Sequence, residues 1–200
     1  MSQPSDNTIR YYDDHTDEYV TSTFKMDMES LYQPFLELIP VCGRILDAGC
    51  GSGRDTKAFL ERGYDVTAID ASSKMVESAA QLTGVTVEQV CFQELEHEAE
   101  FHGVWACASL LHVPRSDLYD VLERIQLALR PGGVCFMSFK LGEEERLHGD
   151  RRFTDFTAES LDSCLAGHLG LHVVRVWISD DVRPERNDQW VNALVRKRSY

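Results

Sequence analysis

A carboxylate and three glycines stand together in residues 45–53, I-L-D-A-G-C-G-S-G. Glycine at 49, 51 and 53 lets the backbone approach a ligand that a Cβ atom would keep away. The apolar residues before Asp47 indicate a short buried strand, and the residues after Gly53 indicate a helix over 54–62. A glycine-rich turn between strand and helix directs backbone N–H groups to one edge of a sheet, which suits a polar or anionic ligand.

The details of this turn discriminate between ligands. A dinucleotide fingerprint requires G-x-G-x-x-G, but here the third glycine comes one residue early and Arg54 holds its place. The carboxylate of Asp47 would repel a pyrophosphate, whereas it can accept hydrogen bonds from a cationic amine. The phosphate-loop pattern G-x-x-x-x-G-K-[ST] is absent. A glycine turn that serves only strand–helix packing is the remaining alternative.

A second carboxylate, Asp70, follows 21 residues after Gly49 and ends a predicted strand over 65–70. The carboxyl end of such a strand faces the ligand crevice of an open α/β sheet, where a carboxylate can bind both ribose hydroxyls of an adenosine. The alternative is an exposed strand-end residue or a helix cap.

The elements that must position these residues alternate along the chain. Hydrophobic periodicity, caps and turn residues predict helices over 8–20, 26–39, 54–62, 73–82, 114–129 and 157–168. They predict strands over 44–48, 65–70, 85–92, 103–108, 134–140, 171–178 and 190–195, and charged loops over 142–152 and 180–188. This repetition predicts a mostly parallel, doubly wound sheet with helices on both faces. The loop between the last two strands is too short for a crossover helix, so those strands should pair antiparallel.

The pattern D-A-G-C-G-S-G, followed by Asp70, resembles motif I of the class I S-adenosylmethionine (SAM) dependent methyltransferases. This resemblance implies a Rossmann-like α/β fold whose seven strands have the order 3-2-1-4-5-7-6, with the last strand antiparallel. It covers residues 44–198, with residues 1–40 as an N-terminal cap of lid helices, and we expect one domain over 1–200. Size and layout are similar to the tellurite-resistance-like and general small-molecule methyltransferases.

The resemblance also implies the cofactor, SAM, with S-adenosylhomocysteine (SAH) as product. Ala71 and Met75 would place apolar surface on the adenine, although Met75 fits the core equally well. Cys91 and Phe92 stand where the family often has Asp and a hydrophobic residue. Cysteine accepts hydrogen bonds poorly, so backbone groups or Glu94 would replace that Asp. The cofactor-binding residues expected in this way are Asp47, Gly49, Gly51, Gly53, Asp70, Ala71, Met75, Cys91, Phe92, Ala108 and Ser109.

The loop after the fourth strand would run beside the methionine part of SAM. His112 in this loop is the candidate catalytic residue, since it could accept a proton from the nucleophile; a purely loop-shaping role is the favoured alternative. Arg54 could pair with Asp55 or Asp47, or reach the SAM carboxylate. Charged residues after the fifth strand, among them Lys140 and Arg151, are interpreted as a solvated loop.

Aromatic residues crowd the first predicted helix, where Tyr12, His15 and Tyr19 fall on one side at 3.6 residues per turn. A helix that buries a single stripe against the core needs fewer aromatic residues than this one has. We therefore predict that this helix is a lid over the cofactor pocket, that Tyr12 forms part of the pocket wall, and that the lid is partly mobile without ligand. A helix simply docked on the core is the alternative.

Composition narrows the possible partners. The net charge of −13 over 200 residues argues against a nucleic-acid partner. The six cysteines have no C-x-x-C spacing, which favours reduced thiols of a cytoplasmic protein over disulfides or a metal site. No apolar run approaches the roughly 18 residues of a membrane span. We expect a monomer or homodimer.

These observations predict methyl transfer from SAM to a small-molecule acceptor by in-line displacement. Aligning the acceptor is the main requirement, and a general base is optional. A SAM-binding regulatory module without its own activity is the first alternative. A nicotinamide-dependent oxidoreductase is the second, and Arg54 at the third-glycine position counts against it.

Overall fold

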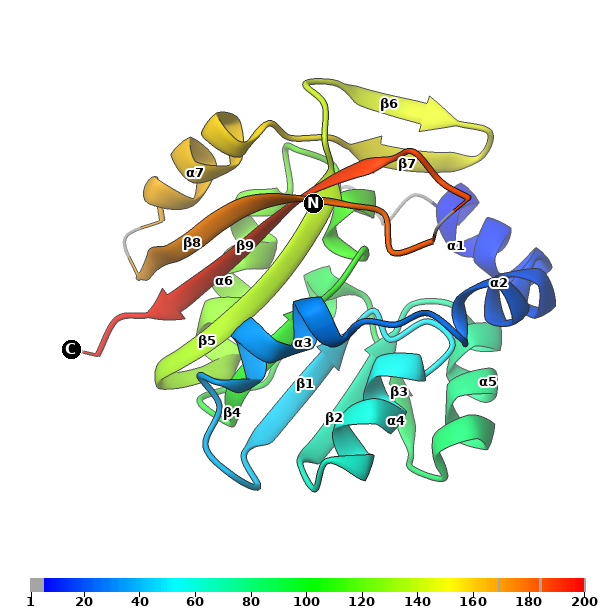
Figure 1. Cartoon of the computed structure of the whole chain (residues 1–200), viewed down its shortest axis with the longest axis horizontal. Coiled ribbons are helices and arrows are strands. Elements are labelled where there is room, and N and C mark those ends of the chain that lie inside the picture. The colour runs from blue at the N-terminus through cyan, green and yellow to red at the C-terminus, as the bar shows by residue number, and fades with distance from the viewer. Residues whose placement is uncertain (1–5, 169, 184, 200) are drawn as a thin grey trace.

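A seven-stranded sheet forms the centre of the protein, with strands in the order β3-β2-β1-β4-β5-β9-β8 (Figure 1). The computed structural model describes residues 6–168, 170–183 and 185–199. The strands of this sheet are β1 (Arg44–Ala48), β2 (Asp65–Asp70), β3 (Val87–Gln89), β4 (Phe101–Ala106), β5 (Leu129–Lys140), β8 (Leu171–Asp180) and β9 (Gln189–Lys197). The helices are α1 (Asp6–Asp14), α2 (Thr16–Thr23), α3 (Glu29–Leu36), α4 (Arg54–Glu61), α5 (Ser73–Thr83), α6 (Leu118–Ala128) and α7 (Ala158–Ala166), with 3-10 turns η1 (Phe92–Glu94) and η2 (Leu110–His112).

The pairing of the strands confirms the expected topology. Strands β3, β2, β1, β4 and β5 are parallel, and β9 runs antiparallel to both β5 and β8. The carboxyl ends of β1, β2 and β4 therefore meet at one edge of the sheet, which brings the glycine turn, Asp70 and the loop before His112 together.

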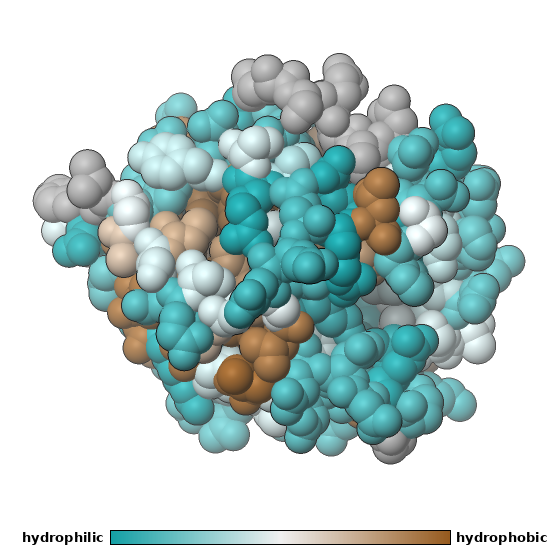
Figure 2. All heavy atoms as spheres, turned by 90° about the horizontal axis from the view of Figure 1, so that it is seen from above, coloured by the Kyte–Doolittle hydropathy of each residue, from teal (hydrophilic) through white to brown (hydrophobic). Residues whose placement is uncertain are grey.

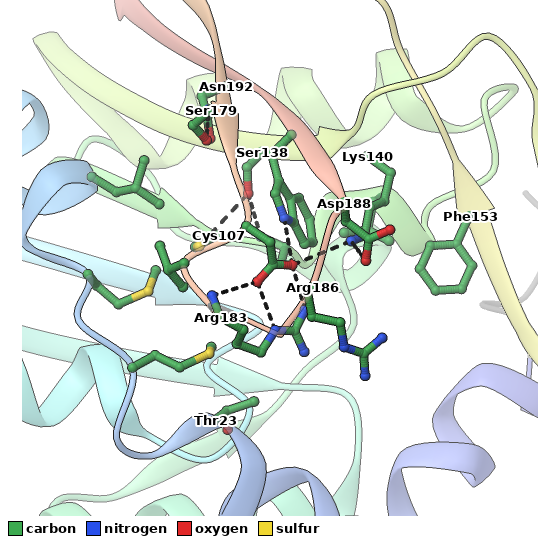
Figure 3. Close-up of a pocket in the computed structure, with 18 of the residues that line it drawn as sticks. Thr23, Cys107, Ser138, Lys140, Phe153, Ser179, Arg183, Arg186, Asp188 and Asn192 are labelled. Carbon is green, nitrogen blue, oxygen red and sulfur yellow. Dashed lines mark hydrogen bonds and ion pairs between the residues drawn. The ribbon is translucent and has the colours of Figure 1, made fainter.

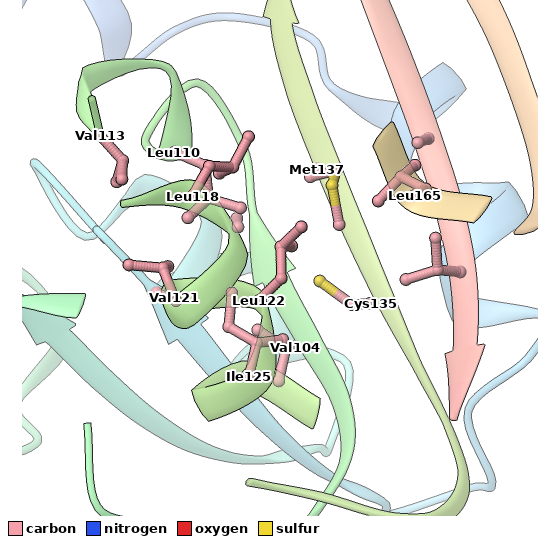
Figure 4. Close-up of a cluster of buried hydrophobic side chains, with 14 of the residues drawn as sticks. Val104, Leu110, Val113, Leu118, Val121, Leu122, Ile125, Cys135, Met137 and Leu165 are labelled. Atoms are coloured by element: carbon pink, nitrogen blue, oxygen red, sulfur yellow. The ribbon is translucent and has the colours of Figure 1, made fainter. Parts of the chain in front are cut away.

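Helices cover both faces of the sheet because its strands are apolar on both sides. On β4, Val104 and Ala106 pack with α6 and α7, whereas Trp105 between them packs with α3 and α4. Trp105 stacks on Phe136 of β5 at 4.1 Å between ring centroids. Helix α6 buries one stripe against β4 and β5 (Figure 4). This stripe consists of Leu118, Val121, Leu122, Ile125 and Ala128, the spacing of an amphipathic helix.

The helix predicted over 8–20 is divided in two at His15, which has non-helical backbone angles (φ −119°, ψ 22°). The hydroxyl of Thr16 bonds the carbonyl oxygens of Tyr12 (2.7 Å) and Asp13 (3.3 Å). A hydroxyl that bonds back to the preceding turn competes with the helix ladder and bends the helix. His15 stacks on Tyr11, with 4.2 Å between ring centroids, and is exposed. The prediction that His15 lies on the same side of one continuous helix as Tyr12 and Tyr19 is wrong.

The segment predicted as a charged loop over 142–152 contains a second, two-stranded sheet of β6 (Glu145–His148) and β7 (Arg151–Thr154). Its first strand is mostly exposed, while Phe153 and Thr154 of the second strand are buried. Arg146 stacks over Phe153 and pairs with Asp155 at 2.6 Å. The charged residues of this segment therefore predicted a loop, whereas the segment forms a hairpin. The hairpin lies over the carboxyl edge of the main sheet, near α1 (Figure 1).

Other boundaries differ from those predicted by a few residues. Strand β3 is shorter than 85–92 because it is an edge strand and its sole partner, β2, ends at Asp70. Helix α3 is shorter than 26–39 because Asp27 bonds the amide of Glu29 in a turn before it and Pro34 removes a donor inside it. None of the helices in the described part of the chain combines the length and the apolar character that crossing a membrane requires.

Candidate functional site

The glycine turn is held in the conformation that the sequence predicts. Gly49, Gly51 and Gly53 have φ values of 78°, 53° and 79°, a region that residues with a Cβ rarely adopt. The amides of Gly49 and Cys50 both donate to the carbonyl of Ile69 at 2.9 Å, which ties the turn to β2. A Cβ on Gly51 would lie 3.2 Å from the Tyr19 ring, so only glycine keeps this space open.

Asp70 joins the two strand ends. Its carboxylate accepts hydrogen bonds from the amides of Gly51 (2.8 Å) and Ser72 (2.9 Å). Burial raises the pKa of Asp70, and these amide bonds oppose that rise. A carboxylate has about four acceptor positions, so acceptor capacity remains for hydroxyls of a bound molecule.

A cavity of about 110 Å³ opens beside Asp70. Its wall contains every predicted site residue except Asp47, Gly53 and Met75. The predicted residues in the wall are Tyr12, Gly49, Gly51, Asp70, Ala71, Cys91, Phe92, Ala108, Ser109 and His112. We call this space the inner cavity. The ribose-type acceptor at Asp70 and the apolar Ala71 and Phe92 fit the adenosine part of SAM.

The three remaining residues lie behind the wall. Asp47 is buried and accepts a hydrogen bond of 2.6 Å from Thr56; burial, with the nearby Asp55, raises the pKa of Asp47 to about 8. A Cβ on Gly53 would lie 3.0 Å from Ala79, so this glycine allows α4 to approach α5. Met75 is buried in the core. Strand alternation and the helix turn point these positions away from the crevice.

The adenine end of the inner cavity differs from the expectation in one respect. Glu94 turns back toward the amide of Cys91 (3.4 Å) instead of facing the cavity. Gln93, which sequence reasoning missed, lies in the wall. Its amide can donate and accept, as an adenine edge requires. The sequence offers no signal for it, because the 3-10 turn that exposes it replaces the end of a predicted strand.

The loop after β4 is held beside the glycine turn by hydrogen bonds to β1 and β5. Ser109 donates to the carbonyl of Ala48 at 2.7 Å, and the amide of Ala108 donates to Ser138 at 2.8 Å. Ala108 has φ 51°, a strained value for a residue with a Cβ, which is common where backbone faces a ligand.

His112 lies between two hydrogen-bond partners. Its Nδ1 is 2.6 Å from the carbonyl of Arg152 and its Nε2 is 2.8 Å from the Tyr12 hydroxyl. A carbonyl only accepts, so Nδ1 carries the proton and Nε2 accepts from Tyr12. Burial lowers the pKa of His112 to about 4, and burial raises that of Tyr12 to about 12. Both groups are therefore neutral near pH 7.

A second cavity of about 330 Å³ adjoins the first, since Tyr12, Tyr19, Ala108 and His112 line both. We call it the outer cavity. Its wall is made by α2, the end of β4, the hairpin β6–β7 and the tips of β8 and β9. Figure 3 shows how side chains from these distant segments converge on it. Part of this wall lies in the segments over 142–152 and 180–188 that the sequence predicts as charged loops, and sequence reasoning therefore did not assign those residues to a site.

Ion pairs fix one side of the outer cavity. Asp181 accepts hydrogen bonds from Arg183 (2.7 Å) and from the Trp190 indole (3.0 Å). Lys140 bonds Asp188 at 2.7 Å and lies 3.9 Å from the centre of the Trp190 ring (Figure 3). These contacts give the tips of β8 and β9 a defined position above β5.

The alternatives for Arg54 are resolved. It pairs with Asp55 through two hydrogen bonds of 2.6 and 2.9 Å. Tyr32 and Trp105 also donate to Asp55, at 2.5 and 2.8 Å. Although burial opposes its ionisation, Arg54 and these donors hold the pKa of Asp55 below its usual value.

Helix α1 is attached to the rim of the inner cavity. Asp13 accepts hydrogen bonds from the hydroxyl of Ser72 (2.6 Å) and the amide of Lys74 (3.1 Å), at the start of α5. Thr8 accepts from the amide of Arg152 at 3.1 Å on the opposite side. The helix thus bridges α5 and β7, with Tyr12 directed into the site between them.

Two further observations concern the surroundings of the site. The face seen from above is largely hydrophilic, and its hydrophobic residues form separate patches (Figure 2). Within residues 6–168, 170–183 and 185–199, no three His, Cys, Asp or Glu side chains gather as a metal site would require.

Comparison with known proteins extends these findings. Residues 45–133 match the family model described as a methyltransferase domain. The malonyl-[acyl-carrier protein] O-methyltransferase of Salmonella typhimurium is 35% identical over 136 residues, which are 66% of this chain and 53% of that protein. A ubiquinone biosynthesis O-methyltransferase of Xylella fastidiosa is 27% identical over 177 residues, covering 77% of this chain and 69% of the relative. The chain spans about half to two thirds of the length of such curated relatives.

A solved structure matches over the whole chain. It is 1,6-didemethyltoxoflavin-N1-methyltransferase of Burkholderia thailandensis with bound 1,6-didemethyltoxoflavin and SAH. It has a TM-score of 0.78 and 26% identity, and the match covers 100% of this chain and 92% of the other. The fold and the glycine turn thus define a Rossmann-like methyltransferase domain. These matches support a class I SAM-dependent methyltransferase.

Proposed function

We propose that this protein transfers a methyl group from SAM to a small-molecule acceptor by in-line displacement. The observation that carries the proposal is the arrangement of two adjoining cavities that share Tyr12 and His112. One has the features of an adenosine site, and the other has room for an acceptor. A SAM-binding module without activity would not need the second cavity.

The residues of the inner cavity would hold SAM. Asp70 would accept hydrogen bonds from the ribose hydroxyls, Phe92 and Ala71 would contact the adenine, and Gln93 would bond its edge. Gly49 and Ala108 would face the methionine part, at the junction of the cavities. When bound, SAM supplies a methyl group already activated by its sulfonium charge. The protein's contribution is then to align the acceptor and exclude water.

Tyr12 and His112 would handle the acceptor's proton. The Tyr12 hydroxyl donates to Nε2 of His112; its oxygen also interacts with Arg151, and its second lone pair can accept a hydrogen bond from an acceptor O–H or N–H. As the acceptor loses its proton to Tyr12, the Tyr12 proton can pass to Nε2. In this proposal His112 acts through Tyr12, because the tyrosine hydroxyl lies between Nε2 and the acceptor.

The remaining features of the proposal concern the protein as a whole. We propose that the N-terminal helices and the core act as one domain, since α1 contacts both α5 and β7. The cysteines in the described residues are free thiols, which supports a reducing compartment such as the cytoplasm. The net charge of −13 supports a partner other than nucleic acid, and we propose a monomer or homodimer.

Ligand binding and turnover test the proposal in two steps. Calorimetry should detect SAM and SAH at micromolar or tighter dissociation constants, and no binding of NADH. Incubation with methyl-labelled SAM and a panel of small-molecule acceptors should then transfer label. NADH binding without SAH binding would contradict the family assignment of the cofactor. SAH binding without turnover on a broad metabolite panel would favour the regulatory module.

A further inference from the structure

The outer cavity contains more positive charge than its own carboxylates neutralise. Four of its cationic side chains have carboxylate partners, each at 2.6 or 2.7 Å. These pairs are Arg54–Asp55, Lys140–Asp188, Arg146–Asp155 and Arg183–Asp181. Arg151 and Arg186 also line the cavity, and neither has a carboxylate within ion-pair distance among the described residues. Asp180 also lines the cavity, outside these four pairs, so the described side chains leave an excess of one positive charge in a protein whose net charge is −13.

Arg151 is held in place without being neutralised. Its guanidinium lies 4.3 Å from the centre of the Tyr11 ring and 5.3 Å from that of Phe153. Its Nε is buried and has no hydrogen-bond partner in the described part of the chain. Aromatic stacking fixes the plane of a guanidinium while its N–H donors stay available at the edge. Arg151 therefore has a fixed orientation beside the Tyr12 hydroxyl, with which part of its guanidinium interacts, and its Nε–H remains an unused donor.

Arg151 lies near the two residues that are proposed to take up the acceptor's proton. Arg151 lines the outer cavity together with Tyr12 and His112, which also line the inner cavity, and its charge lowers the pKa of both residues. Arg186 comes from the opposite wall, between β8 and β9, and its guanidinium extends away from the paired Lys140–Asp188 group (Figure 3). A ligand in the outer cavity would thus have one arginine near its reacting end and another on the far side.

We propose that the methyl acceptor is an anion whose carboxylate or phosphate-type group is bound by Arg151, with Arg186 as a second contact. The planar guanidinium fork matches both kinds of oxyanion and binds them with charge-assisted hydrogen bonds. This inference rests on the proposed function, since it names the substrate class of the same site. A guanidinium recognises a carboxylate and a phosphate in the same way, and the experiment below distinguishes the two groups.

The test uses a small-molecule extract of the source organism, separated on an anion exchanger before any reaction. The retained and unretained fractions are each incubated with the protein and methyl-labelled SAM. Label should be incorporated with the retained fraction alone. Prior treatment of this fraction with a phosphatase removes phosphate esters, so loss of labelling assigns a phosphate and continued labelling assigns a carboxylate or phosphonate. Labelling from the unretained fraction alone would overturn the inference.

Variants connect the anion to its arginine. In Arg151→Met, kcat/KM with the retained fraction should fall roughly tenfold to hundredfold, the value of a charge-assisted hydrogen bond, and Arg151→Lys should restore part of it. Arg186→Met should have a smaller effect. Arg175→Met is the matched control, because Arg175 is exposed on β8, stacked over Trp177 and outside the cavity.

Binding of SAH distinguishes the possible failures. SAH affinity should be the same in Arg151→Met and in the unsubstituted protein. If it falls in parallel with kcat/KM, Arg151 holds the cofactor's own carboxylate and the inference is wrong. Absence of label in every fraction, although SAH binds, would contradict the proposed function and this inference with it. Activity of Arg151→Met equal to that of the control would contradict the inference alone.

Discussion

The inner and outer cavities are built in different ways. The inner cavity is formed largely by backbone: amide hydrogen bonds to Asp70 and Ile69 join the glycine turn to the end of β2, and the Ser109 hydroxyl joins the loop after β4 to the end of β1. The outer cavity is formed by long side chains from α2, β7 and the tips of β8 and β9. A backbone site tolerates little variation and binds a constant ligand, whereas a side-chain site can change without disturbing the sheet. This difference fits an invariant cofactor beside a specific acceptor.

The largest expected effect is at the backbone site. Gly51→Val should abolish SAH binding, because the residue has φ 53° and a Cβ there already lies 3.2 Å from the Tyr19 ring. Gly63→Val is the matched control, with φ 84° and open space around the added Cβ. Both variants carry similar backbone strain. Thermal unfolding should show that both variants fold, and calorimetry should show loss of SAH binding in Gly51→Val alone. SAH binding by a folded Gly51→Val protein would contradict the view that the inner cavity is a backbone site with no room for a side chain at residue 51.

The same contrast explains what could be predicted from the sequence. The parallel sheet with its antiparallel end, the glycine turn and Asp70 could be predicted, because they depend on residues close together in the chain and on hydrophobic periodicity; the strand order was implied by the family resemblance. Arg151 could not, because its place in the site depends on a hairpin whose strands are short and charged. The inward direction of Gln93 and the outward stacking of His15 depend on single turns. Hydrophobic periodicity does not predict the direction of a single side chain within a turn.

Substitution of Asp70 should have the next largest effect on SAH binding. Asp70→Ala removes a charged acceptor for neutral hydroxyls, worth about 1.5–3 kcal/mol, so the SAH dissociation constant should rise about 10- to 150-fold. Asp65→Ala, at the exposed start of the same strand, should leave it unchanged. Calorimetry measures both. An unaltered dissociation constant in folded Asp70→Ala would remove Asp70 from the ligand site.

His112 links the two cavities and should make stability depend on pH. Its pKa is lowered by burial from 6.5 to about 4, so between these values the unfolded chain binds a proton that the folded protein does not. The stabilisation is complete above pH 6.5 and is lost as pH falls toward 4. Between pH 7.5 and 5.0 the loss should be about 2 kcal/mol.

Denaturant unfolding at the two pH values measures this effect in the unsubstituted protein and in His112→Gln. The glutamine variant should lose less stability on acidification, whatever its stability at pH 7.5. His148→Gln, at an exposed position of the β6–β7 hairpin, serves as the control. Equal pH dependence in all three proteins would show that His112 is not buried as a neutral group.

Tyr12 should affect turnover more than cofactor binding. Tyr12→Phe keeps the ring in the cavity wall but removes the hydroxyl that donates to His112 at 2.8 Å. Loss of a hydrogen bond of about 0.5–1.5 kcal/mol should lower kcat about two- to tenfold, with little change in SAH affinity. Tyr11→Phe, on the outward stack with His15, is the control. Unchanged kcat in Tyr12→Phe would exclude the proposed proton relay.

The smallest effect concerns the lid, where side chains hold α1 against the backbone site. Asp13 accepts from Ser72 and from the amide of Lys74, and a bound SAH molecule beneath Tyr12 should strengthen this attachment. Hydrogen exchange of residues 8–20 should therefore be slower with SAH than without. Asp13→Ala should increase exchange in both states and raise the SAH dissociation rate a fewfold, because one surface attachment is lost while the cavity is unchanged. Asp14→Ala, at the neighbouring exposed position, is the control. Equal exchange with and without SAH, together with full activity after deletion of residues 1–20, would contradict the lid and leave α1 as a docked helix.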